Sequence, residues 1–179
     1  MSREIEIKLL DINVEEIRTF LKSKDASFDA KYNFKRVVFD TIPTNPDAWI
    51  RLRSDSTTTT LTYKCIHSDA MNGTEEIEVT VDSFGDTKEL LEKAGLTSRN
   101  YQENTREQYF WNDCQITIDT WPQIAPYVEI ESTSEELVAD CLKRFEGLYG
   151  RTTTDSTDKL YADQGINLHD IKELKFDEN

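Results

Sequence analysis

The sequence predicts an α+β domain built around a mostly antiparallel sheet of about eight strands, large enough to curl into a barrel. Two observations lead to this fold class. Apolar and polar residues alternate with a period of two along most of the chain, which is typical of strands with one buried face. Helical patterns stand only between groups of such strands, which favours antiparallel hairpins with helices packed outside.

The N-terminal half begins with strict alternation over residues 3–10. A helix is expected over 14–25, with Asn13 as its N-terminal cap. Four strands follow, and the proline-containing turn after the first of them separates it from the second. Their expected ranges are 30–40, 48–55, 58–66 and 74–82.

The second half opens with a helix over 83–94 that ends at Gly95, a residue type favoured just after a helix. Three further strands and two helices are expected: strands at 99–112, 114–121 and 127–132, and helices at 134–146 and 155–163. The chain shows neither an internal repeat nor a flexible linker. Residues 1–167 are therefore expected to form one domain and residues 168–179 a charged, partly helical tail.

The charge balance restricts the class of partner. The 179 residues include 35 acidic and 21 basic residues, for a formal net charge of −14. Nucleic acids and anionic membranes attract positively charged surfaces, so neither is expected as a partner. The charged N-terminus and the absence of a long apolar run predict a cytoplasmic protein without a membrane span.

Several common chemistries lack their residues here. The six glycines are scattered and form neither a Walker loop nor a dinucleotide-binding fingerprint. Three distant cysteines suit reduced thiols better than disulfides or a zinc site. With two isolated histidines, the chain also offers little for a nucleophilic triad.

Each expected strand has one apolar face and one ionic face, because side chains at i and i+2 point the same way. The ionic faces carry Glu4, Glu6, Glu76, Glu78, Asp119, Glu129 and Glu131 with Lys8, Arg51, Arg53, Lys64 and, if its register follows, Arg106. For a single strand, a solvated face with cross-strand ion pairs is the simpler interpretation. Glu-x-Glu recurs on three strands, however, and like charges so close cost stability unless a ligand lies between them.

The chemistry of this face points to a metal-bound polyphosphate. Clustered carboxylates are oxygen ligands suited to Mg²⁺ or Mn²⁺. Arginine and lysine opposite them match phosphate oxygens, arginine through its two-pronged guanidinium. A site that meets both signs in one interior therefore predicts a small phosphate-rich ligand with a divalent cation.

The order of these motifs resembles the CYTH superfamily, the triphosphate tunnel metalloenzymes. The similar pieces are Glu4-Ile-Glu-Ile-Lys8, Phe39-Asp-Thr-x-Pro43, Arg51-Leu-Arg53, Lys64, Glu76-Ile-Glu78, Arg106, Asp119 and Glu129-Ile-Glu131. The resemblance covers residues 3–165 and implies an eight-stranded antiparallel β-barrel, or tunnel, that binds a triphosphate with a divalent metal. Members of this superfamily include class IV adenylyl cyclases, thiamine triphosphatases and inorganic tripolyphosphatases.

The resemblance also implies a role for each matching residue. The catalytic group would be Glu4, Glu6, Lys8, Glu76 and Glu78. The triphosphate would be bound by Lys8, Arg51, Arg53, Lys64 and Arg106. The metal, Mg²⁺ or Mn²⁺, would be held by Glu4, Glu6, Asp119, Glu129 and Glu131.

Two positions depart from the family pattern. Many members have lysine two residues before the arginine of the sixth strand, where this chain has Asn104. Many also have an acid where this chain has Arg36. Arg36 either restores the missing positive charge or faces solvent, and the sequence leaves both interpretations open.

Three functions remain compatible with the sequence. The first is a metal-dependent phosphohydrolase that cleaves inorganic tripolyphosphate or a nucleoside or organic triphosphate. The second is a class IV adenylyl cyclase that converts ATP to cyclic AMP and pyrophosphate. The third is a non-catalytic polyphosphate- or metal-binding module. In each case the expected partner is a small-molecule triphosphate, and the chain is expected to be a monomer or a homodimer.

Overall fold

The protein forms one curled sheet with helices around it. The computed structural model describes residues 2–177, and the side chains of residues 2–4 lie outside the described part. The strands are β1 (Ser2–Glu4), β2 (Glu6–Leu10), β3 (Ser27–Asp40), β4 (Ala48–Ser54), β5 (Thr59–Ile66), β6 (Thr74–Val81), β7 (Ser98–Trp111), β8 (Cys114–Thr120), β9 (Tyr127–Glu131), β10 (Arg151–Thr153) and β11 (Glu173–Leu174). The helices are α1 (Val14–Ser23), α2 (Phe84–Lys93), α3 (Glu135–Arg144), α4 (Thr157–Ala162) and the 3₁₀ helix η1 (Leu168–Asp170).

The N-terminal segment closes the sheet into a ring. Strand order runs β1-β6-β5-β4-β3-β7-β8-β9-β2-β10. β1 and β2 thus lie toward opposite ends of this order, although only Ile5 separates them in the chain. β1 pairs with β6 and β2 pairs with β9, both antiparallel. Counted as one strand, this segment and β3–β9 make the predicted eight-stranded antiparallel barrel.

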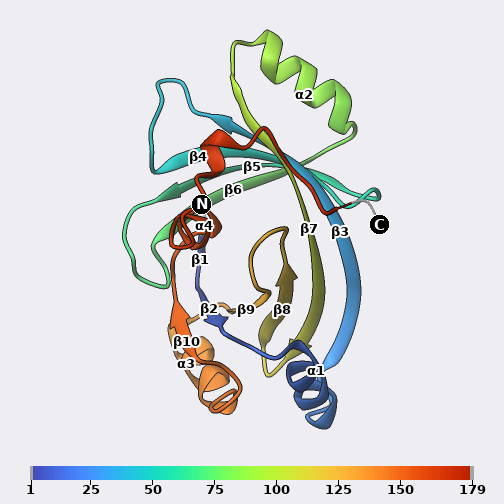
Figure 1. Cartoon of the computed structure of the whole chain (residues 1–179), viewed down its shortest axis with the longest axis vertical. Coiled ribbons are helices and arrows are strands. Elements are labelled where there is room, and N and C mark those ends of the chain that lie inside the picture. The colour runs from blue at the N-terminus through green and yellow to red at the C-terminus, as the bar shows by residue number, and fades with distance from the viewer. Residues whose placement is uncertain (1, 178–179) are drawn as a thin grey trace.

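Helices pack against the outer face of the sheet, as predicted, although they leave part of it uncovered. Figure 1 shows α1 and α3 at one end of the molecule and α2 at the other. α1 and α3 pack on an apolar cluster that includes Leu9, Ile116 and Ile130. α2 covers a second cluster around Phe39 and Leu52. Burial of these aliphatic faces is the main source of stability, so the polar faces of the same strands must point inward.

The helix boundaries follow from local chemistry. The Asn13 side chain accepts hydrogen bonds from the backbone N–H groups of Glu15 and Glu16, which confirms the predicted cap of α1. Gly95 follows α2 with φ of 101°, a conformation that a residue with a Cβ atom adopts only at a cost. Among the described residues, each helix is too short or too polar to cross a membrane.

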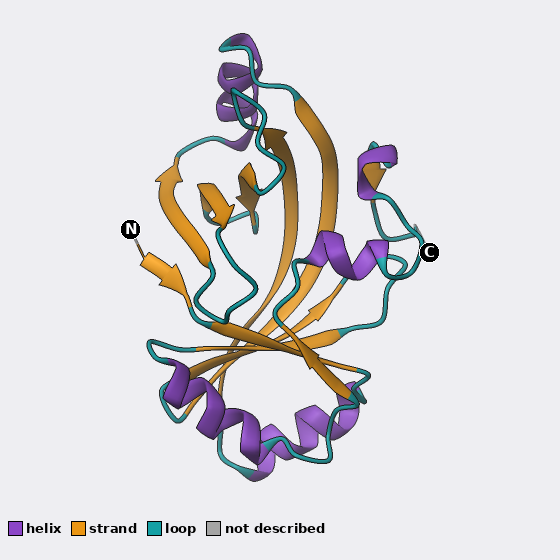
Figure 2. Ribbon diagram, turned by 90° about the vertical axis from the view of Figure 1, so that its left-hand side faces the viewer, coloured by secondary structure: helices purple, strands orange, loops and turns teal. Residues whose placement is uncertain are grey.

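α4 and the C-terminal segment lie across one end of the barrel. Leu160 and Tyr161 of α4 pack with Leu10, Trp121 and Tyr127, which continue the inner faces of their strands. Leu168 and Leu174 join this third cluster, and β11 pairs with β7. Figure 2 shows α4 beside the barrel, away from the pair formed by α1 and α3. This end of the interior is therefore apolar and packed.

The fold differs from the expectation in three details. The first strand, expected over 3–10, is divided at Ile5 because its two parts pair with different strands. The short strands β10 and β11 lie outside the ranges given for the expected strands. No helix within residues 2–177 covers the outer face of β6, where Ile77 and Val79 are 45% and 52% exposed.

Candidate functional site

The site is the ionic inner face of the barrel, which we call the lining. Register places Arg51 opposite Thr62, Thr62 opposite Glu78, and Lys64 opposite Glu76. On the other side of the ring, Arg106 lies opposite Asp119, and Glu6 and Lys8 lie opposite Glu131 and Glu129. The expected ionic faces therefore share one interior. The register of β7 also places Arg106 on this face, which the sequence had left conditional. The side chain of Glu4 lies outside the described residues.

Lys8, Glu129, Arg106 and Asp119 form one buried network. Lys8 Nζ lies 2.6 Å from Glu6 Oε1 and 3.2 Å from Glu129 Oε1. Arg106 bridges the next two acids, with Nη2 2.6 Å from Glu129 Oε2 and 2.8 Å from Asp119 Oδ2. Asp119 is fully buried and also accepts hydrogen bonds from Thr117 and Asn104. These bonds occupy both of its oxygens, so in this arrangement Asp119 holds Arg106 in place.

A second network lines the opposite wall. Lys64 Nζ lies 2.8 Å from Glu76 Oε2. Glu78 Oε2 accepts a hydrogen bond of 2.7 Å from Thr62 and lies 3.4 Å from Arg51 Nη2 and 3.8 Å from Arg53 Nη2. The Arg53 guanidinium stacks on Phe34, 4.6 Å from the ring centroid. Glu76 and Glu78 therefore orient the cations of this wall.

The structure resolves the question of Arg36 that the sequence left open. Arg36 is 7% exposed and points into the barrel, where it donates a hydrogen bond to Asn104 Oδ1. Its guanidinium stacks on Trp121, 4.5 Å from the ring centroid. The sequence had left its direction open, although its position two residues from Val38, which lies on an inward face, was a usable signal.

Burial and neighbouring charges shift the pKa values of these groups. Burial alone would raise the pKa of Glu129, but Lys8 and Arg106 lower it to about 2. Burial outweighs Arg106 at Asp119 and raises the pKa of its carboxyl group. Burial followed by the charges of Arg51 and Arg106 lowers the pKa of Arg53 to about 9. The interior thus disfavours the charged form of one acid, Asp119, and of one cation, Arg53.

The carboxylates suit a hard divalent cation in kind. Glu6 and Glu131 are cross-strand neighbours, and Glu129 shares their face. Among the described residues, no three acidic, histidine or cysteine side chains are already grouped as a metal site. Mg²⁺ commonly takes only one or two carboxylates and fills its shell with water and substrate phosphate, which is a set that Glu6 and Glu131 offer.

Acid is expected to destabilise the protein through Glu129. Its folded pKa of about 2 lies below the ordinary value of 4.5. A depressed folded pKa contributes stability that is present above the unfolded value and is lost as the pH falls toward 2. The melting temperature should therefore fall more steeply in this range for the wild-type protein than for Glu129→Gln. Parallel curves for the two proteins would contradict this prediction.

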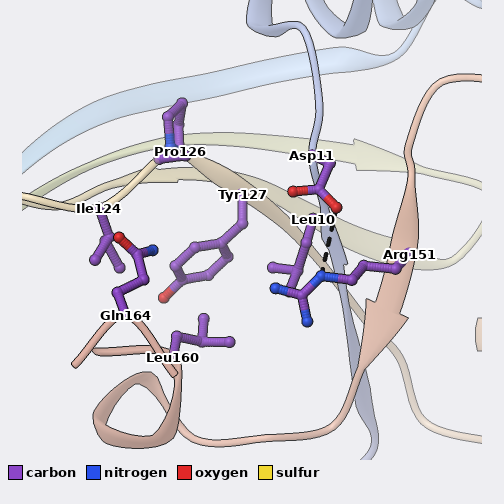
Figure 3. A pocket seen from close by; sticks show the side chains of 9 residues that line it. Leu10, Asp11, Ile124, Pro126, Tyr127, Arg151, Leu160 and Gln164 are labelled. Carbon is purple, nitrogen blue, oxygen red and sulfur yellow. Dashed lines mark ion pairs between the residues drawn. The ribbon is translucent and has the colours of Figure 1, made fainter. Parts of the chain in front are cut away.

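A small pocket lies beyond the apolar end of the barrel and is separate from the lining. It encloses about 40 Å³, room for little more than a water molecule. Figure 3 shows the ring of Tyr127 between Ile124 and Leu160, beside the ion pair of Asp11 with Arg151. Its size and walls do not suit a polyphosphate.

The protein is thus a β-tunnel: a curled antiparallel sheet with an ionic interior and with apolar side chains packed at one end. The sequence matches the CYTH domain family over residues 2–161, so the chain belongs to that family. It matches none of the curated proteins with which it was compared.

Solved structures share this fold at low sequence identity. A conserved hypothetical protein from Pyrococcus furiosus is 19% identical with a TM-score of 0.73, covering 86% of this chain and 97% of that one. A candidate adenylate cyclase from Vibrio parahaemolyticus is 14% identical with a TM-score of 0.72, covering 90% and 98%. A candidate adenylyl cyclase from Hippeastrum, described as having a dominant triphosphatase activity, is 17% identical with a TM-score of 0.67, covering 93% and 97%. At these identities the likeness concerns the fold.

Proposed function

We propose that the protein is a divalent-metal-dependent hydrolase of triphosphates. The observation that supports this most is the convergence of five cations from several strands on one interior. We call these residues the clamp: Lys8, Arg51, Arg53, Lys64 and Arg106. Each is held there by acids, which fixes its position before a ligand arrives. An interior lined by cations from several strands suits a linear polyanion.

The reaction needs little covalent chemistry from the protein. A water oxygen forms a bond to the terminal phosphorus, and the bridging oxygen leaves with the electron pair of the broken bond. Tripolyphosphate and water thereby yield pyrophosphate and orthophosphate. The clamp cations hold the chain and stabilise the charge that develops on its oxygens. A divalent cation held by Glu6 and Glu131 would polarise phosphate oxygens and lower the pKa of bound water.

Formation of cyclic AMP is the second candidate. It requires the ribose 3′-hydroxyl of ATP to attack the α-phosphorus, with pyrophosphate as the leaving group. The observation that favours a nucleotide is a pair of stacked aromatic rings, Tyr32 and Phe34, with centroids 5.5 Å apart. They lie on the inner face of β3, opposite Arg106 and Asn104, and aromatic faces accept nucleobases.

One assay separates these functions. Purified protein is incubated with tripolyphosphate and, separately, with ATP, each in the presence of Mg²⁺ or Mn²⁺. Orthophosphate released from tripolyphosphate supports the hydrolase. Cyclic AMP as the main product from ATP would replace our first choice by the cyclase. Binding of either compound without turnover would identify a non-catalytic polyphosphate-binding module.

Loss of one clamp cation should weaken substrate binding. We expect Arg53→Ala to raise KM for tripolyphosphate about 10- to 100-fold, because it removes charge-assisted hydrogen bonds to phosphate. Arg151→Ala is the matched control, since that arginine is exposed and pairs with Asp11 outside the lining. Steady-state kinetics measure both, and an unchanged KM in Arg53→Ala would remove Arg53 from the clamp.

A further inference from the structure

The two ends of the lining differ in how much solvent they meet. Along β2, the exposed fraction of the side chain falls from 23% at Glu6 to 4% at Lys8. Leu10, the next residue on that face, is packed in the apolar end. β9 shows the same trend, from half-buried Glu131 to buried Tyr127. The Glu6 end is therefore the more solvent-exposed end of the lining, and the other end is packed with apolar side chains.

Arg36 lies where the polar lining meets this apolar end. Trp121, on which its guanidinium stacks, belongs to the same cluster as Tyr161 of α4. Among the ion pairs formed within residues 5–177, none joins Arg36 to a carboxylate. Its guanidinium donates a hydrogen bond to the neutral amide of Asn104, and its Nε has no hydrogen-bond partner within that part of the chain.

The charges around Arg36 add to this imbalance. Burial and then the charges of Arg51, Arg53 and Arg106 lower the pKa of Arg36 well below its ordinary value. Nε of Arg51 is also buried without a hydrogen-bond partner within the described residues. A buried cation with like-charged neighbours and unused donors costs stability. An anion with several acceptor oxygens would relieve the repulsion and accept from these donors.

We propose that Arg36 binds the terminal phosphate of the substrate, which enters the barrel with that phosphate leading. Asn104 accepts a hydrogen bond from the Arg36 guanidinium and donates one to Asp119, which fixes the guanidinium, and Trp121 supports its face. The substrate class is then a linear chain with a free terminal phosphate, such as tripolyphosphate or a nucleoside triphosphate. Chains that carry a nucleoside at both ends lack the group that Arg36 binds and should bind only weakly. This inference rests on the proposed function and deepens it.

The test is a binding experiment that does not depend on turnover. Isothermal titration with Mg²⁺ present compares imidotriphosphate, which has free ends and resists hydrolysis, with diadenosine triphosphate, which has none. Arg36→Gln keeps an amide for Asn104 but removes the charge. Lys35→Gln is the matched control, because Lys35 is the exposed neighbour on the outer face and lies over Phe84.

We expect Arg36→Gln to bind imidotriphosphate about 10- to 100-fold more weakly than wild type, the loss typical of charged hydrogen bonds. Its weak binding of diadenosine triphosphate should be unchanged, and Lys35→Gln should match wild type with both. Without ligand, Arg36→Gln should melt no lower than wild type, because an unpaired buried cation is gone. Should Arg36→Gln fail to fold, Arg36→Lys serves instead, with an intermediate loss for imidotriphosphate.

The outcomes separate the two levels of the argument. If wild-type protein binds neither probe, the proposed function itself is wrong. If wild type binds imidotriphosphate and the Arg36 variant binds it equally well, the inference fails while the proposed function stands. Equal weakening toward both probes would also overturn it, because Arg36 would then contact the chain away from its free end.

Discussion

Replacement of Glu131 by glutamine is expected to lower kcat by about 10³-fold, with little change in the fold. Glu131 lies opposite Glu6 across β2 and β9, so the pair offers two carboxylates to one cation. Glutamine keeps the size of the side chain and can keep the contact with Gln115. It removes the charge that holds a divalent ion, whose contribution to phosphoryl transfer amounts to several kcal/mol.

Turnover of tripolyphosphate and calorimetric titration of Mn²⁺ measure the two consequences separately. We expect metal affinity to fall together with kcat, while the melting temperature without metal is retained or raised, because one of two facing like charges is gone. Glu136→Gln is the control, since Glu136 is an exposed glutamate of α3 outside the barrel. A variant that loses activity only in proportion to its folded fraction would assign Glu131 a structural role.

Much of this site follows from strand periodicity alone. Lys8 and Leu9 are neighbours in the chain but face the interior and the outer core, because successive strand residues point to opposite sides. The same rule allowed Arg106 on the ionic face if its register followed, and the structure places it there, opposite Asp119. Alternation predicts faces well because a shift of one residue would bury every charge against the helices.

Other features depend on tertiary packing, which local pattern does not encode. Alternation shows that Ile77 and Val79 share a face but not that no helix covers them. Likewise, Arg36 lies opposite Arg53 on the inner face of the sheet, yet its burial depends on Trp121 and on α4, which are distant in sequence. The break at Ile5 depends on which strands close the ring.

Loss of Arg106 is expected to have the largest effect on stability. Arg106→Met should lower the free energy of unfolding at neutral pH by about 3–5 kcal/mol, the usual result of removing one partner from a buried ion pair. Asp119 is fully buried and would keep only its bonds to neutral Thr117 and Asn104. Glu129 would retain Lys8, so the stranded charge is chiefly that of Asp119.

The pH dependence of this loss has a defined sign. Without Arg106, burial is no longer opposed by that cation, so the folded pKa of Asp119 rises further above its unfolded value. A raised folded pKa means that the folded state binds the proton more tightly, so stability is present at low pH and is lost as the pH rises. Urea unfolding of wild type and Arg106→Met should therefore differ less at about pH 4 than at about pH 7.

The double variant Arg106→Met, Asp119→Asn tests the cause directly. Because asparagine carries no charge, it should recover a large part of the stability lost in Arg106→Met, and the remaining loss should vary less with pH in this range. Arg151→Met, on the surface, should change stability by no more than about 0.5 kcal/mol. A double variant as unstable as Arg106→Met would show that Arg106 supports the barrel through packing of its stem rather than through the charge of Asp119.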